Sequence, residues 1–146
     1  MHSFFLVLHV LAATVWTGGH LILAIVVLPK ILKTKNIQAL TEFEENFEKI
    51  GIPALIIQVI TGIYLAYSLL PNVSDWFSFS NHISTHVGIK LILLIITILL
   101  ALDARFRLIP NLSEKNLTSL AVHIFMVTLV AILFVITGLS FRLAII

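Results

Sequence analysis

The chain has 146 residues, of which 60% are hydrophobic and 11% are charged, and its mean hydropathy is +1.12. A water-soluble domain of this size needs more polar surface, so the composition predicts one integral membrane domain over residues 1–146, with the lipid bilayer as its surroundings. A formal net charge of +2 is too small to indicate a nucleic-acid partner. The absence of cysteine excludes disulfides, thiolate metal ligands and a cysteine nucleophile.

Four apolar stretches are long enough to cross a bilayer, because a helix rises about 1.5 Å per residue and the hydrocarbon layer is about 30 Å thick. We expect these spans at residues 4–28, 52–70, 87–108 and 117–143. The first lacks a preceding Lys or Arg and is too long for a cleavable signal peptide, so we interpret it as a retained helix.

The segment between the first two spans, residues 30–49, is charged but repeats apolar residues at helical spacing. This pattern predicts a short amphipathic helix, which lies at the interface or continues into the second span; we favour a solvated linker helix. The second span carries small and weakly polar residues on one face, which we interpret as helix packing rather than ligand binding. These are Gln58, Thr61, Gly62, Leu65 and Ser68.

Short connectors favour an all-α, antiparallel four-helix transmembrane bundle with both termini on one side. Basic residues gather after the first and third spans, and the positive-inside rule then places both termini outside the cytoplasm. They are Lys30, Lys33, Lys35, Lys49, Arg105, Arg107 and Lys115.

The stretch H-V-L-A-A-T-V-W-T-G-G-H within the first span begins at His9 and ends at His20. At about 100° per residue the two imidazoles return to within about 20° of each other and lie about 16 Å apart, with Trp16 between them. Gly18 and Gly19 would let a ring or a neighbouring helix approach the backbone closely. An ionisable group inside a bilayer indicates a functional site with a partner.

The predicted topology gives each membrane histidine a depth. His9 pairs with His86 in the outer half, and His20 pairs with His123 in the inner half. Facing imidazoles and an apolar slot are what a b-type haem requires, so the two pairs predict one or two haems. The alternative is that these histidines only form hydrogen bonds between helices.

Other residues would complete such a site. Lys90 and Arg142 at the outer rim, and Arg105 or Arg107 at the inner rim, would meet haem propionates. Met126, three residues after His123, would replace an inner ligand.

Copper is the competing metal, because imidazole suits it. A chain without cysteine and with only two methionines, Met1 and Met126, argues against a thioether relay. An outer copper site stays open on four residues, since His82 and His86 share a face if their helix begins early. The set is His2, His82, His86 and Asp75.

Several segments resemble the CopD copper-resistance membrane domain: residues 9–20, V-I-T-G-I-Y-L-A in the second span, the third span from G-I-K-L to L-I-P, and I-T-G-L in the fourth. This resemblance implies copper uptake or resistance at a bacterial inner membrane. CopD proteins carry additional helices, and this chain resembles their four-helix core.

The same segments are similar to the HemJ-type protoporphyrinogen oxidase, a small four-helix haem b protein. His9 with Trp16 seven residues later, and Lys90, match that family's pattern, which implies that His9 is a haem ligand and Lys90 a functional cation. The family's histidine beside the lysine is displaced here, because His86 precedes Lys90 by four residues rather than two.

The sequence contains no Ser–His–acid set, phosphate loop or carboxylate dyad within a span, so any catalysis would be the redox chemistry of a cofactor. We therefore expect a haem b protein with bis-histidine ligation that transfers electrons in the membrane. Its redox partner would be a quinone or another cytochrome, and a homo-oligomer is left open. CopD-like copper transport and HemJ-like oxidation are the alternatives.

Overall fold

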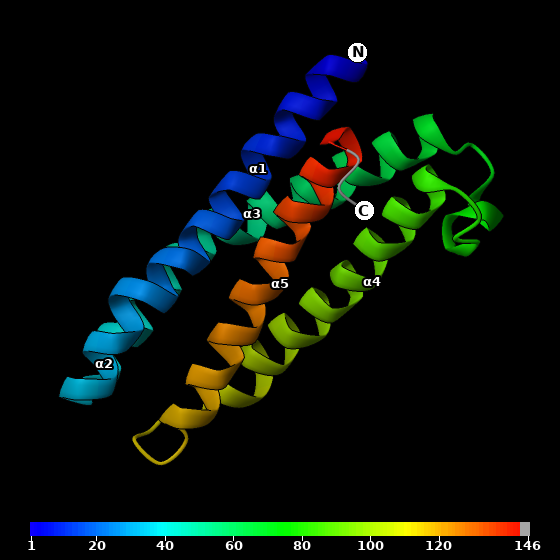
Figure 1. The fold of residues 1–146 in the computed structure, drawn as a ribbon. Coiled ribbons are helices and arrows are strands. Elements are labelled where there is room, and N and C mark those ends of the chain that lie inside the picture. The colour runs from blue at the N-terminus through cyan, green and yellow to red at the C-terminus, as the bar shows by residue number, and fades with distance from the viewer. Residues whose placement is uncertain (144–146) are drawn as a thin grey trace.

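The computed structural model describes residues 1–143, which are helical almost throughout and contain no β-strand. Four continuous helical rods in this part of the chain are long and apolar enough to cross a membrane. They are His2–Thr34, Ile37–Leu69, His82–Leu108 and Leu117–Leu143. The predicted all-α four-helix transmembrane fold is confirmed (Figure 1).

The first rod extends beyond its predicted end at Leu28. It consists of α1 (His2–Ile22), a π-helical turn η1 (Leu23–Val27) and α2 (Leu28–Thr34). Pro29 does not stop it, because the proline directly follows the π-helical turn η1, where the regular i→i−4 hydrogen bonding is already interrupted. The rod ends at Lys35, whose φ of 57° is left-handed.

The amphipathic segment is the first part of α3 (Ile37–Leu69), so the prediction of a separate solvated linker helix is wrong. Asn36 begins the helix by accepting a 3.1 Å hydrogen bond from the Ala39 N–H. Leu40 is fully buried against Leu28 and Ile31 of α2. The apolar face of this segment therefore packs on the first rod, and α3 runs on through Pro53 into the second span.

The third rod begins at His82, five residues before its predicted start, and consists of α4 (His82–Asp103) and a π-helical turn η3 (Ala104–Leu108). The cause is a capping box: the Asn81 side chain accepts from the Ser84 N–H, and the Ser84 hydroxyl accepts from the Asn81 N–H. His82 and His86 therefore share one helix face. The fourth rod is α5 (Leu117–Leu143), as predicted.

The four rods pack in an open arrangement. The α1 helix packs along α3 and against α5, and α5 packs along α4, while α3 and α4 do not pack closely against each other. The start of α1, the end of α3, the start of α4 and the end of α5 lie together, which we call the upper end (Figure 1). The centre of the bundle, between α3 and α4, is where cavities form.

Candidate functional site

Two cavities lie inside the bundle, one above the other. The upper cavity, near the end with both termini, has a volume of about 260 Å³, and the lower cavity, near the opposite end, about 290 Å³. Each is lined by residues from all four rods. Trp16 lines both, so its indole forms part of the wall between them.

The histidines distribute between the cavities in the predicted pairs. His9 and His86 line the upper cavity, and His20 and His123 line the lower one. The predicted rim cations also reach a cavity: Lys90 and Arg142 line the upper one, and Arg105 lines the lower one.

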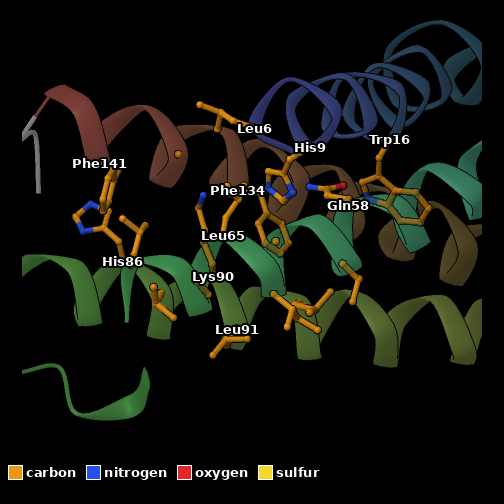
Figure 2. Close-up of a pocket in the computed structure, with 18 of the residues that line it drawn as sticks. Leu6, His9, Trp16, Gln58, Leu65, His86, Lys90, Leu91, Phe134 and Phe141 are labelled. Atoms are coloured by element: carbon orange, nitrogen blue, oxygen red, sulfur yellow. The ribbon is translucent and has the colours of Figure 1, made fainter. Parts of the chain in front are cut away.

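The His9 ring is oriented by α3. The Thr61 hydroxyl donates to the Ile57 carbonyl at 2.6 Å, so its oxygen accepts from His9 Nδ1–H at 2.9 Å. This assigns the proton to Nδ1 and leaves a lone pair on Nε2. Gly62 allows the ring this close, because a Cβ at that position would come within 3.0 Å of His9 Cε1. Figure 2 shows the ring projecting into the cavity from α1.

His86 is satisfied within the protein. Its Nδ1–H donates to the His82 carbonyl at 2.7 Å, and its Nε2 lies 3.1 Å from the Ser140 hydroxyl, whose proton it shares with the Thr137 carbonyl at 3.0 Å. Only 2% of the residue is exposed. In Figure 2 the Lys90 side chain lies between the rings of His86 and His9 along the cavity. His86 thus ties α4 to α5, and a role as a ligand would require release of Ser140.

The upper cavity is basic and contains one unsatisfied acceptor. Lys90 and Arg142 line it, no Asp or Glu does, and within residues 1–143 Lys90 forms no ion pair. Gln58 is buried, and its Oε1 has no hydrogen-bond partner in that part of the chain. Figure 2 shows the amide beside His9. From the sequence we interpreted Gln58 as a helix-packing residue. The feature that could have indicated a place in the cavity is its position one turn before Gly62, on the same face of a membrane helix.

In the lower cavity, His20 lies in an aromatic cluster. Its Nδ1–H donates to the Trp16 carbonyl at 2.8 Å, which leaves the lone pair on Nε2. Its ring centroid lies 4.5 Å from that of Trp16 and 5.3 Å from that of Phe47. The expected close approach occurs at Gly19, where a Cβ would overlap the Phe47 ring; nothing lies within 4 Å of a Cβ at Gly18.

His123 is bound to the neighbouring rod. Its Nε2–H donates to the Leu100 carbonyl at 2.8 Å, one turn before the π-helical turn η3, and Asp103 Oδ2 lies 3.7 Å away. Two carboxylates that the sequence analysis did not select also line this cavity. Glu48 forms a 2.7 Å ion pair with Arg105, and Glu44 lies one turn earlier on α3. They were missed because the segment that carries them was expected to be solvated.

The structure does not bring the other predicted ligands together. Met126 lines neither cavity and is 46% exposed, although it follows His123 by one helical turn. In the copper set, the rings of His82 and His86 lie 4.2 Å apart. Within residues 1–143, however, no group of three or more His, Asp or Glu is placed to hold a metal ion, so His2 and Asp75 do not complete a set.

A family model described as Copper resistance protein D matches residues 41–143, which include most of α3 and all of α4 and α5. The chain belongs to the CopD copper-resistance family. It is thus a multi-pass membrane protein of the copper-resistance type, as the resemblance implied. No curated protein and no solved structure matches the chain. The CopD match includes His86, Lys90 and His123, whereas α1, with His9 and His20, lies outside it.

Proposed function

We propose that this CopD protein binds one haem b in the upper cavity through His9 and acts in membrane electron transfer. The observation that supports the proposal most directly is the free Nε2 lone pair of His9, held toward a basic, largely apolar cavity. A ligand imidazole commonly donates its other N–H to an oriented acceptor, as His9 does to Thr61.

The donor chemistry of the upper cavity suits haem. His9 would supply an imidazole nitrogen to the iron, and Lys90 and Arg142 would bind the propionates as cations without a competing carboxylate in the lining. Haem would supply one-electron redox chemistry, while the protein would supply the imidazole, the charge and the apolar surroundings.

The lower cavity suits haem less well, which favours one haem over two. Glu44 and Glu48 line it, and carboxylates repel propionates. His123 has one nitrogen committed to the Leu100 carbonyl.

Copper handling is the second candidate, and membership of the CopD family favours it. Copper would then be a transported or detoxified ion rather than a resident cofactor. The upper cavity opposes a resident copper ion, because Lys90 and Arg142 repel cations and the described residues offer no three-ligand group. We infer a bacterial inner membrane from membership of the CopD family, and the distribution of basic residues would put the upper cavity on its non-cytoplasmic side.

The test is haem and metal content of the purified protein. We expect a Soret band and a pyridine haemochrome equivalent to about one haem per chain. His9→Gly should lose most of the haem, and added imidazole should restore it. His82→Ala is the matched control, since His82 is exposed and lines neither cavity.

His20→Ala separates one haem from two, because it should leave haem content unchanged. Full haem content in His9→Gly without imidazole would overturn the proposal. A colourless protein that carries copper by elemental analysis would favour the second candidate.

A further inference from the structure

The lower cavity presents hydrogen-bond acceptors without partners. His20 is 9% exposed, and within residues 1–143 its Nε2 has no hydrogen-bond partner. The Nδ1 atom of His123 is free in the same way, because Nε2 carries the proton donated to Leu100. Arg105 engages Glu48, which leaves the Glu44 carboxylate without a partner among the same residues. A ligand that complements these groups must bring donors.

The walls of the lower cavity favour a flat, apolar ring. Trp16 and Phe47 both pack against the His20 ring, with ring centroids 4.5 Å and 5.3 Å from it and 6.3 Å from each other. Aromatic faces and edges pack well against another ring at such separations. The other lining residues are mostly aliphatic side chains of α4 and α5.

The route into the lower cavity leads from the bilayer. On this side its lining comes from α3 and from α4 with η3: Glu44, Phe47, Glu48, Gly51, Ile52, Leu100, Ala101, Ala104 and Arg105. These two rods do not pack closely on each other, and the 2.7 Å ion pair between Arg105 and Glu48 bridges them beside the cavity. The rest of this side, where the helices are not closely packed, is the entry that a lipid-soluble molecule would use.

We propose that the lower cavity binds the headgroup of a membrane hydroquinone. One hydroxyl donates to His20 Nε2 and the other to the Glu44 carboxylate, while the ring packs against Trp16 and Phe47. A hydroquinone combines a planar ring, two donors and an alkyl chain that remains in lipid between α3 and α4. Anionic ligands are disfavoured by the two glutamates, and the described residues lack a group that would hold a metal ion.

The chain carries its own reporter of this binding. It has two tryptophans, Trp16 in the cavity wall and Trp76 in the connector at the opposite end. In a Trp76→Phe background, Trp16 is the sole indole. Decylhydroquinone, added under argon to the whole protein in micelles, should quench Trp16 fluorescence in a saturable manner.

Matched variants and a matched ligand test the contacts. Loss of a hydrogen bond to a charged or buried group should raise the half-saturating concentration about tenfold or more in Glu44→Ala, which has no side-chain acceptor, and in His20→Phe, which keeps a ring. Glu45→Ala, at the exposed next position of α3, should leave it unchanged. The dimethyl ether of decylhydroquinone, which has no hydroxyl donor, should not saturate.

Quenching that is linear in concentration, equal for the ether, or unaltered by Glu44→Ala would overturn the proposal. The measurement is made on haem-free protein, because Trp16 lines both cavities and haem in the upper one would itself quench the indole. His9→Gly, which should lose haem, should retain hydroquinone binding, so failure of one proposal is distinguishable from failure of the other.

Discussion

The contact between Gly19 and Phe47 makes a sharp test of how the lower cavity is built. A Cβ at Gly19 would overlap the Phe47 ring, whereas a Cβ at Gly18 meets nothing within 4 Å. The ring cannot move without cost, because it packs against His20 and Trp16. Overpacking of this kind costs about 1–3 kcal/mol.

The two glycine substitutions differ only in that contact. Gly→Ala gains about 0.5–1 kcal/mol of helix propensity at either position, so this gain cancels between Gly18→Ala and Gly19→Ala. We expect Gly19→Ala to be less stable than Gly18→Ala by about 1–3 kcal/mol. The measurement is the unfolding free energy in mixed micelles titrated with dodecyl sulfate, followed by circular dichroism.

A smaller side chain at position 47 supplies the control. In a Phe47→Leu background the clash is removed, so the two alanine variants should agree within about 0.5 kcal/mol. Equal stabilities of Gly18→Ala and Gly19→Ala in the unaltered background would refute the packing described here.

Asn81→Ala removes the N-cap of α4 and should lower the unfolding free energy by about 1 kcal/mol, whereas Asn81→Asp should keep most of the capping stabilisation. Equal losses for the two variants in the same dodecyl sulfate titration would contradict the capping box. Thr61→Val removes the acceptor that orients His9, so it should weaken haem affinity about 10–100-fold. The measurement is a haem titration of haem-free protein, in which Thr61→Ser should bind nearly as well as the original chain. Unchanged affinity in Thr61→Val would show that the His9 ring does not need this hydrogen bond. A double-mutant cycle on Glu48 and Arg105 should give a coupling free energy of unfolding of only about 0.2–1 kcal/mol, because the Arg105 side chain is 58% exposed. A larger coupling that does not fall with added salt would mean that the ion pair is shielded from water.

Periodicity and hydropathy were sufficient to find the four spans, because a helix that crosses lipid must satisfy its own backbone and be apolar along its length. The depths of the histidines followed from helical rise alone, and each pair does reach a common cavity. The family was indicated by motifs in all four spans; those in the second, third and fourth lie inside the matched residues, whereas residues 9–20 of the first lie outside them.

Side-chain hydrogen bonding was not predictable in the same way. Whether His86 faces a ligand or Ser140 depends on which rotamer α5 leaves room for, and no spacing rule encodes that. The start of α4 was placed late because a capping box depends on two short side chains rather than on hydropathy. The position of Glu44 in the lining of the lower cavity was not predictable, because an amphipathic pattern shows that one face is buried, not which neighbour covers it.

The way the rods pair has a consequence for assembly. The first two rods form one hairpin, α1 against α3, and the last two form another, α4 against α5, so each hairpin joins helices adjacent in the chain. Each can insert into lipid and fold before the halves meet along the line where α1 touches α5. The α1–α5 contact joins the two hairpins, so a small rotation of one half about this contact would widen the space between α3 and α4 and leave the packing within each hairpin intact.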